Sequence, residues 1–179
     1  MVWFGLAGMA FAFFYHGPPF RLSYRGLGEV AVAVAYGPLV TAGTFLVQRG
    51  TIPTSIILLS VPLGVLIAAF LWINEFPDYS ADALSGKRTL VVRLGRAGAA
   101  EGFAWLGVAA AASLALLPAA GLPPSVWLGG VAAFRFVPAA RILMASPEDI
   151  PRLVPAQAMA LQAFLLYAVG ASAGMLLGS

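Results

Sequence analysis

The chain has 179 residues, of which 61% are hydrophobic and only 9% are charged. Soluble domains carry about 25% charged residues, so this composition excludes an ordinary soluble protein. The net charge of +3 needs no nucleic-acid partner, and the lack of cysteine and the single histidine exclude disulfides, thiolate sites and multi-histidine metal sites. We predict an all-α fold, a multi-pass transmembrane helix bundle that forms one domain over residues 1–179.

Six apolar runs predict six membrane spans, since a span needs about 20 apolar residues. The runs cover about residues 2–14, 30–47, 56–73, 100–117, 126–144 and 156–177. The first run is short and lacks a basic flank, which indicates the end of a longer helix rather than a signal peptide. Pro38 and Pro62 fall inside spans and predict kinks, which membrane helices tolerate.

Basic residues are divided unequally between the two ends of these spans. The loops and helix ends after the first, third and fifth spans hold eight Lys and Arg residues, whereas the loops after the second and fourth hold Arg49 alone. Cytoplasmic loops carry the excess of basic residues, so the first set should face the cytoplasm. Two polar segments, residues 15–29 and 74–96, then share one face, which predicts one cytoplasmic site.

Residues 74–96, NEFPDYSADALSGKRTLVVRLGR, are the most polar segment of the chain. Within it, Asn74, Asp78 and Asp82 recur every four residues and would project from one face of a helix. Pro77 is typical of a first helical turn and predicts a helix that restarts after the preceding span ends.

Two carboxylates one turn apart repel each other unless water or a cation separates them. Mg²⁺ takes oxygen ligands, typically one or two carboxylates plus substrate phosphates. Lys87 and Arg88 follow closely and would neutralise phosphate charge that the metal leaves uncovered. The spacing therefore predicts a Mg²⁺–diphosphate site, although an ordinary charged loop between spans is an equally good interpretation of the spacing alone.

The pattern N-x-x-x-D-x-x-x-D, followed by G-K-R-T-L-x-V-R-L-G, resembles the second aspartate-rich motif of the UbiA superfamily of membrane prenyltransferases. Residues 15–29, YHGPPFRLSYRGLGE, resemble the segment before the fifth helix in the branch that prenylates 1,4-dihydroxy-2-naphthoate in menaquinone synthesis. The resemblance implies Mg²⁺-dependent transfer of a polyprenyl group from polyprenyl diphosphate to an aromatic acceptor, in the plasma membrane of a bacterium or archaeon.

The resemblance also implies roles for individual residues. Asp78 and Asp82 would be the catalytic Mg²⁺ ligands, and Asn74 would orient a ligand or the diphosphate. Lys87 and Arg88 would contact the diphosphate, as would three residues of the upstream segment, Arg21, Tyr24 and Arg25.

Many relatives carry a lysine immediately before the tyrosine that matches Tyr24, whereas this chain has Ser23. Arg21 or Arg25 is our substitute for that missing cation. An interfacial belt of aromatic and basic anchors is the alternative for Arg21 and Tyr24, and it is the interpretation we favour for three further aromatic residues, Tyr15, Phe20 and Trp72. We expect Glu29 to cap the start of its own helix, where an acid is favourable.

The family has about nine spans and a first motif, N-D-x-x-D-x-x-x-D, which this sequence lacks. The six predicted spans match the last six, so the chain resembles the C-terminal two-thirds of such an enzyme. It would be a fragment, a misassigned start or one part of a split protein, and inactive without the missing N-terminal segment as partner. An in-frame first motif upstream of codon 1 would test this.

Two alternatives to naphthoate prenylation stay open. Other branches of the family use 4-hydroxybenzoate, homogentisate, haem, chlorophyllide or a glycerol-phosphate lipid, and no residue here separates these acceptors on physical grounds. A non-catalytic membrane subunit or a small transporter is also possible. Transporter sites lie near the membrane midplane, whereas these charges lie at one interface, which favours the enzyme.

Overall fold

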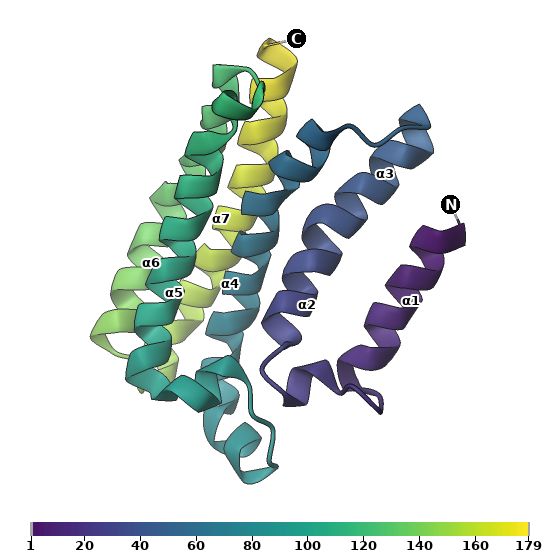
Figure 1. Ribbon diagram of the computed structural model, residues 1–179. Helices are drawn as coiled ribbons and strands as arrows, with labels where there is room; N and C mark the ends of the chain where they lie inside the picture. Colours follow the sequence, from purple (N-terminus) through teal and green to yellow (C-terminus); the bar gives the residue numbers. More distant parts are fainter. Residues whose placement is uncertain (1, 179) are drawn as a thin grey trace.

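The computed structural model describes residues 2–178, and all regular structure in that range is helical (Figure 1). In chain order the helices are α1 (Val2–His16), η1 (Leu22–Tyr24), α2 (Gly28–Val34), η2 (Ala35–Leu39), α3 (Val40–Arg49), α4 (Thr54–Leu84), α5 (Leu90–Leu116), η3 (Pro118–Ala120), η4 (Pro124–Ala132), α6 (Ala133–Ala145) and α7 (Ile150–Leu177).

Five continuous helical stretches are long and apolar enough to cross a membrane, judged by length and composition. They cover residues 28–49, 54–84, 90–116, 124–145 and 150–177, and α1 is a shorter apolar helix. The predicted multi-pass helix bundle is confirmed, with α1 in the place of the first predicted span.

Successive spans alternate in direction, so their connections fall at two opposite ends (Figure 1). The connections at residues 17–27, 85–89 and 146–149 all lie at the lower end in this view. The two polar segments predicted to share a face therefore do lie at one end of the bundle. That this end faces the cytoplasm stays a prediction.

The second span contains Pro38, and the chain passes this proline in a π-helical turn, η2. Proline has no backbone N–H, so a regular α-helical hydrogen bond is missing there. On the opposite helix, α4, Gly64 lies against Gly37. A Cβ added to Gly37 would lie 2.9 Å from the Gly64 Cα, so the close packing of η2 on α4 requires glycine at this position.

The predicted helix restart at Pro77 is wrong, because α4 runs without interruption from Thr54 to Leu84 with Pro62 and Pro77 inside it. A proline inside a helix removes one backbone donor, whereas ending the helix would leave up to four carbonyls without partners. Continuation of the helix is the smaller loss. It carries the predicted site residues beyond the apolar part of the span on a rigid extension.

Trp72 is not part of an interfacial belt, contrary to our prediction. Its side chain is 5% exposed in the core between α4 and α5, and its Nε1–H donates a hydrogen bond of 2.8 Å to the Ala99 carbonyl. A buried indole needs a partner for its N–H, and the backbone of α5 provides one.

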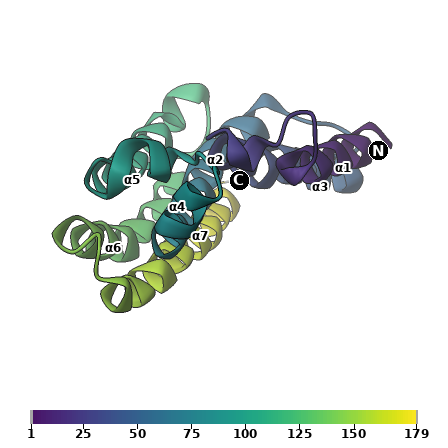
Figure 2. The ribbon, with the colours of Figure 1, turned by 90° about the horizontal axis from the view of Figure 1, so that it is seen from below.

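Helices α4 to α7 pack together, whereas α1 and α3 lie on the opposite side of the molecule (Figure 2). Within the α4–α7 group, α7 lies against η4 at Gly170 and Gly174, where an added Cβ would collide with backbone atoms of Leu128 and Ser125. The Ser125 hydroxyl donates to the Gly174 carbonyl at 2.6 Å. These contacts fix α7 against η4 near the C-terminal end of α7.

Candidate functional site

The C-terminal end of α4 is closed by a Schellman motif, which fixes the start of the G-K-R segment. The Lys87 N–H donates to the Asp82 carbonyl at 2.9 Å, and the Gly86 N–H donates to the Ala83 carbonyl at 3.3 Å. Gly86 has φ +75°, the left-handed conformation that this motif requires and that glycine adopts without strain. The glycine between the aspartates and the basic pair therefore has a defined structural role.

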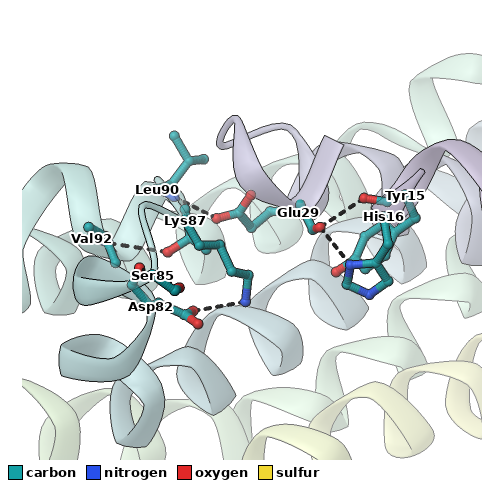
Figure 3. Close-up of polar contacts among 10 residues, drawn as sticks. Tyr15, His16, Glu29, Asp82, Ser85, Lys87, Leu90 and Val92 are labelled. Carbon is teal, nitrogen blue, oxygen red and sulfur yellow. Dashed lines mark hydrogen bonds and ion pairs between the residues drawn. The ribbon is translucent and has the colours of Figure 1, made fainter. Parts of the chain in front are cut away.

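This turn brings the Lys87 side chain back over the end of α4. Its Nζ lies 2.8 Å from Oδ2 of Asp82, and the two side chains are 23% and 13% exposed (Figure 3). Charge-assisted hydrogen bonds of this length are the stronger class in proteins. Two of the predicted site residues are thus in direct contact.

The N-terminus of α5 is capped by two side chains from different parts of the chain. The Thr89 hydroxyl oxygen accepts a hydrogen bond from the Val92 N–H at 3.2 Å. Oε1 of Glu29, at the start of α2, accepts one from the Leu90 N–H at 2.9 Å (Figure 3). Our prediction that Glu29 caps its own helix is therefore wrong. The carboxylate instead lies at the positive end of a neighbouring helix dipole, where an acid is favourable.

Glu29 and Glu75 are both buried, with exposed fractions of 3% and 7%, and each has a buried Oε2 without a hydrogen-bond partner. Thr89, Glu29, Asp82 and Lys87 all lie close enough to Glu75 to act on it electrostatically. Buried carboxylates without full pairing are costly, so their presence together indicates a functional cluster.

The upstream segment is joined to the α4–α5 connection through backbone atoms. The Arg88 N–H donates to the Tyr24 carbonyl at 3.1 Å. The Arg93 guanidinium donates to the carbonyls of Arg25 at 2.8 Å and Arg88 at 3.0 Å. The two polar segments therefore form one structural unit.

Ser23 is buried at the centre of the upstream segment. Its hydroxyl donates to the Tyr15 carbonyl at 2.8 Å and lies 2.9 Å from Nδ1 of His16. Ser23 thus has a structural role in this chain, as does His16. The Arg21 guanidinium stacks over the Tyr24 ring at 4.4 Å from its centroid, a cation–π contact.

The remaining predicted residues are less constrained. Asn74 is partly buried, whereas Asp78, Arg25 and Arg88 are exposed. The Asp78 side chain has no hydrogen-bond or ion-pair partner among residues 2–178. The structure thus brings Asp82 and Lys87 into contact but leaves Asp78 open to solvent.

Sequence reasoning missed Glu75 and misassigned Glu29. A signal for Glu75 was present, because it precedes Asp82 by seven residues, which is two helical turns and places both on one face of α4. No local signal could assign Glu29, since its partner Leu90 lies 61 positions away in the chain.

Asp78 and Asp82, the candidate metal ligands on α4, offer oxygen atoms, which are the ligands that Mg²⁺ prefers. Over the described range, 2–178, no three His, Cys, Asp or Glu side chains are grouped closely enough to hold a metal. One or two carboxylates without further protein ligands is the arrangement in which substrate phosphates complete a Mg²⁺ shell. Asp78 and Asp82 fit that arrangement.

An apolar crevice of about 400 Å³ lies beside this polar cluster, between α1 and α2. Its lining includes Phe11, Val32 and Tyr36, together with Tyr15. The Tyr15 hydroxyl is within electrostatic range of Glu29, Glu75 and Asp82. The site thus joins a polar end to apolar walls.

A model of the UbiA prenyltransferase family matches residues 1–166. The chain belongs to this family. The region matched includes both polar segments and all the predicted site residues. Comparison with solved structures gave no significant match.

Several curated relatives resemble this UbiA-family chain. The 1,4-dihydroxy-2-naphthoate octaprenyltransferase of Escherichia coli (strain K12) is 34% identical over 151 residues, 82% of this chain and 49% of the relative. The protein of the same name from Bacillus subtilis (strain 168) is 32% identical over 95 residues, 53% of this chain and 30% of the relative. The 2-carboxy-1,4-naphthoquinone phytyltransferase of Synechocystis sp. is 37% identical over 81 residues, which are 45% of this chain and 26% of the relative. The chain thus spans about half the length of these relatives or less.

The role of Gly86 gives a first prediction. Gly86→Ala in the full-length UbiA protein should lower the free energy of unfolding by about 1–2 kcal/mol, because the left-handed conformation is unfavourable for alanine. An added Cβ meets no atom within 4 Å, so the effect comes from the backbone alone. Displacement of Lys87 should also lower catalytic activity about tenfold, which corresponds to about 1.4 kcal/mol of lost transition-state stabilisation.

Gly50 provides a matched control. It ends α3 at the opposite end of the bundle, with φ +73° and equally open space around its Cβ position. Gly50→Ala should lower the free energy of unfolding to a similar extent while retaining activity. Equal activity losses in the two variants would show that Gly86 has no specific role in the site.

Proposed function

We propose that this chain is part of a Mg²⁺-dependent prenyltransferase that moves a polyprenyl group from polyprenyl diphosphate to an aromatic acceptor. We propose 1,4-dihydroxy-2-naphthoate as that acceptor, in menaquinone biosynthesis. The observation that carries the proposal is the contact between Asp82 and Lys87 at the end of a membrane-length helix, in a chain of the UbiA family. The names of the E. coli and B. subtilis relatives support the acceptor.

The diphosphate would bind where the oxygen ligands and the cations of this end meet. Asp78 and Asp82 would hold Mg²⁺ from α4, with Asn74 one turn earlier. Bound Mg²⁺ would offset the negative charge that develops on the departing diphosphate. Lys87, which contacts Asp82, would contribute a second positive charge.

The upstream segment would supply further positive charge. Arg21 and Arg25 of this segment, together with Arg88 of the α4–α5 connection, are exposed at the same end of the bundle and would contact phosphate oxygens. Tyr24, which stacks on Arg21, would orient that guanidinium. The arrangement stabilises charge where it develops as the allylic C–O bond breaks, which is the largest single contribution in many enzymes.

The apolar surroundings of the site would protect the reaction. Allylic carbocations react with water, so a site for this chemistry must exclude it. The α1–α2 crevice offers apolar walls, and Tyr15 in its lining lies within electrostatic range of Glu29, Glu75 and Asp82. The prenyl tail would extend from there into the lipid bilayer. We propose that the site opens on the cytoplasmic face, because the basic loops gather at this end.

The proposal is tested by prenyl transfer in membranes that contain the full-length protein. We expect product with 1,4-dihydroxy-2-naphthoate and a polyprenyl diphosphate, dependent on Mg²⁺ and lost on addition of EDTA. Parallel reactions with 4-hydroxybenzoate and homogentisate test the acceptor. If one of these acceptors gave product and the naphthoate gave none, the proposed prenyltransferase activity would stand and the naphthoate would be excluded as its acceptor.

A further inference from the structure

A second apolar crevice lies between α5 and α6, on the side of the bundle away from α1 and α3 (Figure 2). Its volume is about 580 Å³. Ligand pockets in proteins usually measure about 300–1,000 Å³. Most of the lining residues contributed by α5 are small, namely Ala104, Gly107, Ala110, Ala111 and Ala115.

The crevice remains open because one large side chain holds the two helices apart. Phe136 of α6 stacks on Phe103 of α5, with ring centroids 4.7 Å apart. Its ring also lies against Gly107, where an added Cβ would collide with it. The neighbouring alanines have too little volume to fill the space on either side of this ring. Small residues usually let membrane helices approach closely, and here they leave an apolar groove instead.

The crevice has one basic end. Arg141 lines the crevice. It lies one turn before the C-terminus of α6, at the end of the bundle where the basic loops gather. Its side chain is exposed, and within residues 2–178 it has no hydrogen-bond or ion-pair partner. An unpaired arginine beside an otherwise apolar groove is complementary to an anion that carries a hydrocarbon chain.

We propose that this crevice binds an acyl chain of an anionic membrane phospholipid whose phosphate contacts Arg141. The apolar lining accommodates the chain, and the guanidinium can hold phosphate oxygens with two donors. Basic pockets between transmembrane helices are known to bind anionic head groups. The crevice shares no lining residue with the α1–α2 crevice or the α4–α5 connection, so this lipid site is independent of the proposed prenyl transfer.

Lipid binding to the full-length protein in detergent micelles tests the proposal. The protein is titrated with phosphatidylglycerol or phosphatidylethanolamine, and bound lipid is counted by native mass spectrometry. We expect phosphatidylglycerol to bind about fivefold more tightly, which is the contribution of one basic side chain near an anionic lipid. Arg141→Gln should remove this preference, because the headgroup contact is lost.

Two further variants distinguish binding of the acyl chain from binding of the lipid headgroup. Ala111→Phe fills the crevice and should weaken the binding of both lipids about tenfold, because the acyl chain can no longer bury its apolar surface there. Arg135→Gln is the matched control, because Arg135 is also an exposed, unpaired arginine of α6 but does not line the crevice. It should leave both affinities unchanged.

Three results would overturn the proposal. Unchanged phosphatidylglycerol binding in Arg141→Gln would place the headgroup elsewhere, and unchanged binding in Ala111→Phe would exclude the crevice. If Ala111→Phe instead dissociated a dimer or released a further protein segment, the crevice would be a protein interface. Arg141 is exposed, so its substitution tests the proposal even if Ala111→Phe fails to fold.

Discussion

Asp82→Asn in the full-length protein should lower the rate of prenyl transfer on the order of 10²-fold, since the loss of one group that stabilises developing charge costs about this much. The asparagine has nearly the same shape but cannot pair with Lys87 or bind Mg²⁺ as a carboxylate does. The rate is measured with saturating acceptor over a range of Mg²⁺ concentrations. Raised Mg²⁺ should restore part of the activity.

The partner variant Lys87→Gln distinguishes the two roles. It should lower the rate through loss of a diphosphate contact, so raised Mg²⁺ should not restore it. Because the two side chains are 2.8 Å apart, the double variant should lose less than the product of the single losses. Strictly independent losses would show that the pair does not act together.

Asp149→Asn is the matched control for Asp82→Asn. Asp149 lies at the same end of the bundle, where it caps α7 by accepting a hydrogen bond from the Arg152 N–H. Its substitution removes the same charge and should change the rate less than twofold. If Asp82→Asn kept full activity, the metal role proposed for Asp82 would be wrong.

Glu29→Ala should lower the free energy of unfolding by about 1–3 kcal/mol, the cost of leaving a buried donor without its partner. The donor is the Leu90 N–H at the start of α5, whose hydrogen bond to Glu29 measures 2.9 Å. The loss should also loosen the connection that carries Lys87. Chemical or thermal unfolding in detergent measures the first effect, and the rate of prenyl transfer measures the second.

Glu29→Gln separates the hydrogen bond from the charge. The amide oxygen can still accept from Leu90, and the negative charge near Glu75 is removed, so stability should change by less than about 1 kcal/mol. Glu101→Ala, an exposed acid on α5, should change stability by less than about 0.5 kcal/mol. A loss in Glu29→Gln as large as that in Glu29→Ala would show that charge, and not capping, is the important property.

Local and periodic features of this protein were predictable from its sequence. Apolar runs fix where helices can cross a membrane, and the alternation of successive spans predicted which loops lie at one end. Asp149 follows Ser-Pro-Glu in the sequence, a pattern typical of a helix start, and it caps α7. The helical spacing of the acids predicted that Asp82 belongs to the site, and the turn after α4 brings Lys87 into contact with Asp82.

Several misassigned residues depend on contacts between distant parts of the chain. Tryptophan is a residue type typical of interfacial anchors, but the Trp72 N–H donates a hydrogen bond to the Ala99 carbonyl on the next helix. Pro77 has the pattern of a helix start, but continuing α4 preserves more backbone hydrogen bonds than restarting it. Neither outcome can be read from a window of neighbouring residues.

The sequence by itself determined that this is a membrane helix bundle with a polar end that carries a family motif, because hydropathy, charge and helical period act within a few turns. Tertiary structure alone decided that Glu29 caps α5, that Glu75 is buried beside it, and that Asp78 stays open to solvent. The physical reason is that the burial and hydrogen-bond partner of a side chain are set by whichever helix packs against it, and that helix can lie far away in the chain.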